Sequence, residues 1–93
     1  MKARCTELYH ERRDCWQEGK VSDAVEVVAR KWTCRASTDY VLEARVMVDS
    51  KVVTKSREVY SIEYCGTDTA LIRKAIALFD ALLESHQRHD ALT

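Results

Sequence analysis

Residues 40–91 read YVLEARVMVDSKVVTKSREVYSIEYCGTDTALIRKAIALFDALLESHQRHDA. This stretch predicts two β-strands, at 40–49 and 52–65, and then a long helix that begins at Gly66-Thr67-Asp68. In the first strand apolar residues alternate with more polar ones, so one face of the sheet is built to be covered. The predicted cover is the helix, in which apolar residues recur at spacings of three and four: Ile72, Ala75, Ile76, Phe79, Leu82 and Leu83.

The chain before this unit leaves two arrangements open. Apolar residues between charged positions predict an amphipathic helix at residues 3–18 that Gly19 ends. Residues 21–34 suit either a helix capped by Ser22 or a strand from about Val25, because the run Val25-Glu-Val-Val is rich in β-branched residues. We favour the strand, since a hairpin usually needs a third strand to be independently stable.

The predicted fold is therefore one compact α+β domain over residues 1–93. It has an N-terminal helix, a three-stranded antiparallel sheet and a long C-terminal helix, in the order α-β-β-β-α, with ααββα as the alternative. Within the hairpin we expect a three-residue loop at 49–51, which places Val48 opposite Val52. The same register sets Glu43 opposite Arg57 and Tyr40 opposite Tyr60, and opposite charges favour it over a two-residue loop.

Composition narrows the class of protein. Fifteen basic and fifteen acidic residues give a net charge of zero, so the overall field does not attract nucleic acid. The first twenty residues lack the apolar run of a signal peptide, and no apolar stretch is long enough to span a bilayer. We expect a cytoplasmic protein whose four cysteines, Cys5, Cys15, Cys34 and Cys65, are reduced thiols.

No motif nominates a chemical site. The cysteines lie 10, 19 and 31 positions apart, whereas zinc sites usually draw paired ligands from short turns. Cys5 and Cys15 are most simply core residues. Cys34 lies among arginine and lysine residues, but no histidine that could take its proton is nearby in the sequence. We therefore predict no catalytic residue, no metal site and no cofactor, and a protein that is not an enzyme.

The predicted function is stoichiometric binding to a protein. The sheet face opposite the long helix should present basic and apolar side chains of the hairpin, a mixture typical of interfaces. We expect the partner-binding residues to be Arg45, Met47, Lys55, Arg57, Trp32 and Arg35. In size and class the chain is similar to stand-alone inhibitors and adaptors, including phage-encoded inhibitors of bacterial defence enzymes, and a homo-oligomer is left open.

The alternative function is nucleic-acid binding. Residues 30–35 are basic around Trp32, and the α-β-β-β-α order resembles the double-stranded-RNA-binding domain over most of the chain. That resemblance implies contacts to duplex RNA. We expect no membrane partner under either function. The lysine-rich signature that this family carries at the start of its last helix has no counterpart at residues 66–70, where Asp68 is acidic.

Overall fold

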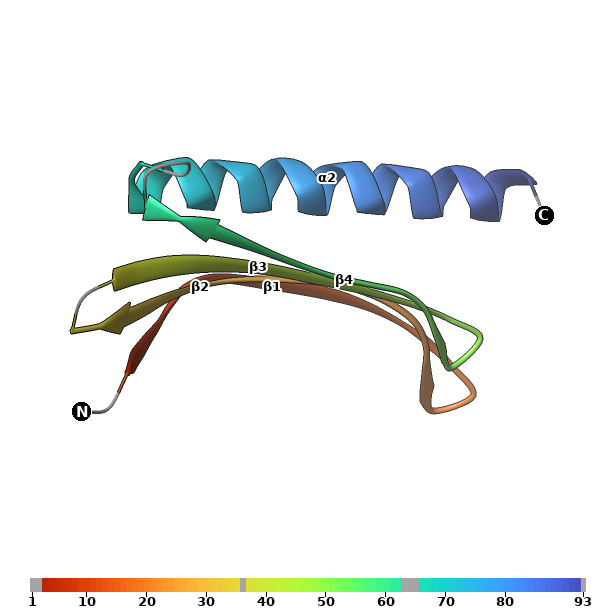
Figure 1. Ribbon diagram of the computed structural model, residues 1–93. Coiled ribbons are helices and arrows are strands. Elements are labelled where there is room, and N and C mark those ends of the chain that lie inside the picture. Colours follow the sequence, from red (N-terminus) through yellow and green to blue (C-terminus); the bar gives the residue numbers. More distant parts are fainter. Residues whose placement is uncertain (1–2, 36, 63–65, 93) are drawn as a thin grey trace.

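The computed structural model describes residues 3–35, 37–62 and 66–92. Four strands are followed by one long helix: β1 (Arg4–Gln17), β2 (Lys20–Cys34), β3 (Ser37–Val48), β4 (Lys51–Ser61) and α2 (Asp68–Leu92). The strands form one antiparallel sheet in the order β1-β2-β3-β4, and α2 lies across one side of it (Figure 1). Both tight hairpin turns lie at one end of the sheet and bend away from α2.

The predicted N-terminal helix is wrong, because those residues form β1. Glu7 pairs with Arg30 and Tyr9 with Ala29, so Leu8 is an extra residue that bulges out of the ladder. The bulge shifts the side-chain alternation, so the consecutive apolar residues Leu8 and Tyr9 both pack against the core. In the sequence, two consecutive apolar residues break the strand period and imitate a helical face. A two-residue turn at residues 18–19, both with positive φ, then leads into β2.

The strand at 21–34 is confirmed, and the helical alternative is wrong. β2 is an inner strand with neighbours on both sides, which explains its buried run from Ala24 to Ala29, interrupted only by half-buried Glu26. Strands buried on both faces favour β-branched residues over strict alternation. The observed order β-β-β-β-α replaces both α-β-β-β-α and ααββα, so the fold implied by the resemblance to the double-stranded-RNA-binding domain is also wrong.

The β3–β4 hairpin has the predicted pairs in its centre and a different turn. Glu43 lies opposite Arg57 and Tyr40 opposite Tyr60, as predicted. The loop is shorter than predicted, because it consists of Asp49 and Ser50 with φ values of 53° and 64°. Val53 bulges out of β4 and restores the register, so Val48 pairs with Lys51 rather than with Val52. β4 ends at Ser61, before the predicted end at Cys65, which lies outside the described residues.

The core lies between α2 and one face of the sheet. Leu71, Ala75 and Phe79 are buried on the helix, against alternate residues of the two inner strands: Val25, Val27, Ala29, Tyr40, Leu42, Ala44 and Val46. The prediction that Phe79 is central is confirmed. The apolar stripe is rotated from the predicted one, since Ile76 is 42% exposed. We call the covered side the helix face and the opposite side, which carries Glu26, Glu43 and Arg45, the open face.

The first turn of α2 is fixed by polar contacts to the sheet. Thr67 caps the helix, because its Oγ1 accepts a hydrogen bond from the Ala70 N–H at 3.1 Å. Asp68, the next residue, accepts from the Tyr40 hydroxyl at 2.8 Å and from Lys31 Nζ at 3.1 Å. The hydrogen bonds from Tyr40 and then Lys31 lower the pKa of Asp68.

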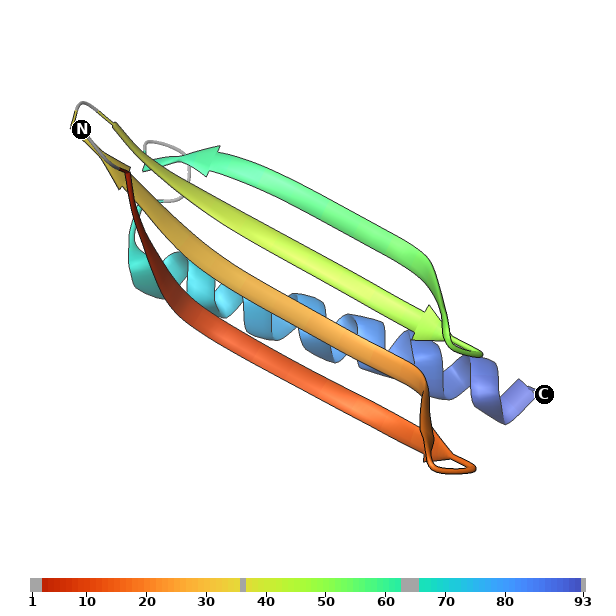
Figure 2. The same cartoon turned by 90° about the horizontal axis from the view of Figure 1, so that it is seen from below.

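The helix covers the sheet unevenly. α2 packs mainly against β2 and more lightly against β1 and β3. Seen from below, it crosses behind β1 and β2, whereas β4 lies clear of it at the far edge (Figure 2). Every residue of β4 from Lys51 to Val59 is exposed. The sheet therefore has one edge strand under the helix and one that is uncovered.

Candidate protein-binding surface

The open face of the sheet carries rows of charged side chains. A shallow basin of about 310 Å³ lies over β2, β3 and β4 on this face. Its lining mixes acidic, basic and small residues: Glu26, Val28, Arg30, Glu43, Ala44, Arg45, Lys55, Ser56 and Arg57. Side chains two residues apart along a strand share a face, so each strand carries a row of charges here. Pairing of the strands places these rows next to one another.

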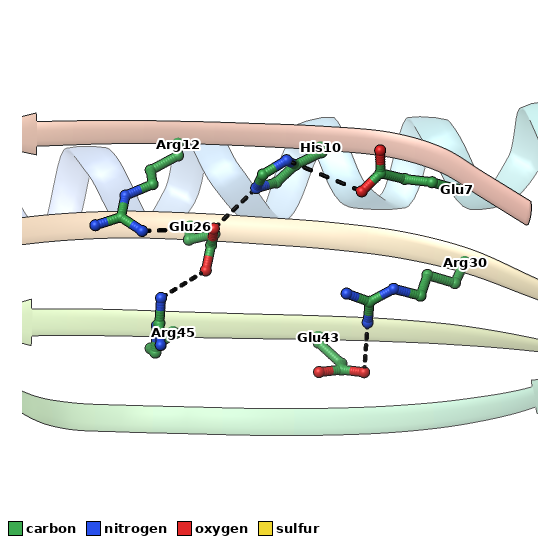
Figure 3. A network of polar contacts seen from close by, with 7 residues as sticks. All are labelled: Glu7, His10, Arg12, Glu26, Arg30, Glu43 and Arg45. Atoms are coloured by element: carbon green, nitrogen blue, oxygen red, sulfur yellow. Dashed lines mark hydrogen bonds and ion pairs between the residues drawn. The ribbon is translucent and has the colours of Figure 1, made fainter.

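Glu26 is the centre of the first group of charges (Figure 3). Its carboxylate is bonded to His10 Nε2 at 2.8 Å and to Arg45 Nη2 at 2.9 Å, and Arg12 Nη1 lies 3.9 Å away. Partial burial alone would raise the pKa of Glu26, but the His10 hydrogen bond and the nearby charges of Arg45, His10 and Arg12 outweigh it, and the pKa is lowered. This carboxylate is fully engaged within the chain.

Glu43 is the second occupied carboxylate. Arg30 Nη1 donates to its Oε1 at 2.8 Å, from the neighbouring strand (Figure 3). Each of these two acids therefore already has an arginine partner on the same face. Among the described residues, neither carboxylate forms a salt bridge with a cation of β4.

Lys55 and Arg57 are the cations of β4 on the open face. Lys55 lies opposite Arg45, and Arg57 lies opposite Glu43, whose Oε1 already accepts from Arg30. Within the ranges that the structure describes, neither Lys55 nor Arg57 forms a salt bridge. The β4 cations, as we call this pair, are solvated charges at the uncovered edge.

Exposed valines stand on either side of the β4 cations. Val52 and Val53 are 51% and 59% exposed at one end of the strand, and Val59 is 58% exposed at the other. Isolated exposed valines are ordinary, but here they flank two unpaired cations on one strand. Apolar area beside an arginine is typical of interfaces that exclude water from a charge pair.

The structure brings four of the six predicted partner-binding residues together. Arg45, Met47, Lys55 and Arg57 lie on the open face of adjacent strands. Their states differ, because Arg45 is held by Glu26 and Met47 is half-buried, while the β4 cations are exposed. Arg45 is thus a fixed neighbour of the β4 cations and is not itself free to bind a partner.

Trp32 and the exposed Arg35 lie toward the other end of the sheet, with Trp32 on the same open face as Arg30. Trp32 pairs with Asp39 and Met47 with Ala24, so the two side chains are eight residues apart along β2, which is about 26 Å. The basic segment 30–35 is not one patch. Arg30 points to the open face and binds Glu43, whereas Lys31 points to the helix face and binds Asp68.

Sequence reasoning missed the charges of β1. His10 and Arg12 were assigned to a helix, so nothing placed them beside Glu26. The available signal is the pair Glu18-Gly19, a two-residue turn that lets two long strands fold back on each other. With that hairpin recognised, Arg12 falls opposite Glu26.

The thiols of the described residues are not in the core. Cys5, Cys15 and Cys34 are free and exposed, so the expectation that Cys5 and Cys15 are core residues is wrong. Cys65 lies outside the described residues. In the described part of the chain no group of three or more histidine, cysteine or acidic side chains is arranged to hold a metal ion.

Among the residues with described structure, no helix has the length and apolar character needed to cross a bilayer. Comparison of the chain with protein-family models, curated proteins and solved structures finds no match.

Proposed function

We propose that this chain is a non-enzymatic module that binds an acidic protein stoichiometrically, in the manner of an inhibitor or adaptor. The observation that carries the proposal is the contrast between engaged and free charges on one face. Glu26 and Glu43 are bound by arginines of the chain, whereas the β4 cations have no carboxylate among the described residues. A partner carboxylate placed over β4 meets two cations without displacing an internal salt bridge.

The surroundings of the β4 cations make such a contact specific. The ion pairs beneath them hold the side chains of β2 and β3 in place, so little side-chain freedom is lost there on binding. Arginine forms two parallel hydrogen bonds with a carboxylate, and the flanking valines exclude water from the pair. Nucleic acid is less well matched, because Arg30 and Lys31 of the predicted basic segment are already bound to carboxylates.

The test reverses the charge of the β4 cations. The chain and its Lys55→Glu/Arg57→Glu variant are used to capture proteins from cells of the native host, and the captured protein is then titrated in purified form. We expect the substitution to weaken binding by at least about tenfold, since two charge-assisted contacts become repulsive. Circular dichroism should show a thermal melt within a few degrees of the original, because both side chains are exposed. The new carboxylate at position 57 lies opposite Glu43, but the one at position 55 lies opposite Arg45 and offsets it.

The matched control makes the same charge change on the other edge strand. Arg4→Glu with Arg13→Glu alters two exposed cations of β1 and should leave binding within about twofold. Equal weakening by both double variants would show that the partner responds only to net charge. Retention of a nucleic acid instead of a protein, with a steep dependence on salt, would contradict the proposal.

A further inference from the structure

We propose that the partner binds as an extended segment that adds a fifth strand to the outer edge of β4, with acidic and apolar residues alternating along it. This inference rests on the proposed function and specifies its geometry. β4 is paired with β3 on one side, and no described strand lies on its other side. Along that free edge the backbone N–H and C=O groups of alternate residues face outward, which is the template for strand addition.

The open-face side of the added strand is selected by the β4 cations. Lys55 and Arg57 are two residues apart, so they share a face and stand about 7 Å apart along the strand. Side chains directly opposite on a neighbouring strand lie about 5 Å away. Two acidic residues at alternate positions of the added strand would therefore each face one cation.

The helix-face side of the added strand meets a different surface. Because α2 does not cover β4, a groove of about 270 Å³ remains between them. It is lined by polar groups of β4 and by apolar parts of the helix and of β3: Leu42, Ser56, Glu58, Tyr60, Lys74, Ala77 and Leu78. Residues of the added strand on this side would lie beside Ala77 and Leu78, where apolar side chains bury surface.

Glu58 helps to decide which side of the added strand carries the acidic residues. It lies on the helix face of β4 beside the groove, where its carboxylate accepts a hydrogen bond from the Tyr60 hydroxyl. On that side Glu58 and Lys74 offset each other, so an acidic residue of the added strand gains little there, whereas on the open face it is attracted by both Lys55 and Arg57. A shift by one residue would exchange all of these contacts, so the register is strongly specified.

A second copy of this chain is a poorer occupant of the same edge. To keep both helices on one side of a continuous sheet, two antiparallel β4 strands must pair residues of the same parity. A two-fold axis at Ser56 pairs the whole strand and sets Lys55 of one copy against Arg57 of the other. Moving the axis by one residue sets Lys55 or Arg57 against itself, and like charges directly opposite are destabilising. The edge is thus protected from its own copy and open to an acidic strand.

The experiment uses the intact chain and synthetic peptides as long as β4. The probe alternates glutamate and valine. One control replaces each glutamate with lysine, and a second keeps the glutamates but carries N-methyl groups on alternate backbone nitrogens facing β4. We expect the probe to slow amide hydrogen exchange at outward-facing positions of residues 51–61, with little change in β1. Both controls, and the Lys55→Glu/Arg57→Glu chain with the original probe, should bind at least about tenfold more weakly.

The outcomes separate this inference from the proposed function. Undiminished binding of the N-methylated peptide, or protection of β1 in place of β4, would overturn strand addition. If the charge reversal abolishes capture of the native partner and the probe still gives no protection of β4, the partner binds the open face without adding a strand. If the intact chain alone is a dimer with β4 protected, as measured by light scattering and exchange, the occupant is a second copy. If neither the partner nor the probe depends on the β4 cations, the proposed function fails as well.

Discussion

The two edge strands of the sheet, β1 and β4, differ in how much of each the helix covers. β1 lies partly under α2, and its Leu8 and Tyr9 pack against the core. Its charges on the open face are bonded within the chain, with Arg12 donating to Asp14 at 2.7 Å and His10 bonded to Glu26, whereas Arg4 and Arg13 are exposed. β4 lies beyond the helix and carries two unpaired cations. Proteins normally block their strand edges. The helix here covers one edge strand in part and leaves the other uncovered.

The position of α2 produces this difference. Its first turn is held over the inner strands by the contacts of Lys31 and Tyr40 with Asp68. Its buried side chains then follow the row of small and β-branched residues on β2 and β3. One helix is too narrow to cover four strands, because strands are about 4.8 Å apart and a helix with its side chains is about 10 Å across. One edge had to remain exposed.

The largest effect is expected from weakening the packing of α2 on the sheet. Phe79→Ala removes a large side chain that is 5% exposed in the centre of the core. We expect a loss of about 3–5 kcal/mol in the free energy of unfolding, because the cavity cannot be refilled by the neighbouring strands. Urea titration followed by circular dichroism measures it.

Ile76→Ala is the matched control for that loss. Ile76 lies on the same helix but is 42% exposed, so its truncation should cost less than about 1 kcal/mol. A similar cost for both variants would mean that α2 rests on the sheet by a different face.

A smaller effect should distinguish the occupied charges from the free ones. Glu26→Ala leaves His10, Arg12 and Arg45 close together without their carboxylate, and we expect a loss of about 2 kcal/mol in the free energy of unfolding. Lys55→Ala should change it by less than about 0.5 kcal/mol. If Lys55→Ala proves as costly as Glu26→Ala, the β4 cations have a role in folding and the contrast between the edges is lost.

The smallest predicted effect is on the pH dependence of stability. The pKa of Glu26 is lower in the folded chain than its usual value of 4.5, so the folded state holds this proton less tightly than the unfolded state does. The stabilisation is complete above the usual pKa and is lost as the pH falls through the folded pKa.

Glu26→Gln should therefore flatten the decline in stability below about pH 4.5, measured as the urea midpoint at several pH values. Asp68, whose pKa is also lowered from its usual 3.8, should still contribute a decline at lower pH in this variant. Lys55→Ala serves as the control and should follow the original curve. An unchanged slope in Glu26→Gln would show that the network around Glu26 does not hold its charge in solution.

Part of the candidate surface was predictable from sequence. Alternation along β3 and the Glu43–Arg57 pair place Arg45, Met47, Lys55 and Arg57 on one face, and that placement needs only the strand period. Which of these residues is free was not predictable. Arg45 is occupied because Glu26 comes beside it from a strand nineteen positions earlier, and no local pattern reports such a neighbour.

The sequence by itself determined the long helix and its start near Thr67, the two strands β3 and β4, and the pairing at the middle of their hairpin. These features depend on local periodicity, helix capping and pairs of neighbouring strand residues, and all of these signals lie within short stretches of the sequence. Only the tertiary structure decided that residues 4–17 form a strand, because the bulge at Leu8 disturbs the alternation and β2 supplies the missing partner. It decided between helix and strand for residues 21–34 as well. It also decided which edge is uncovered, since that depends on where one narrow helix settles across four strands.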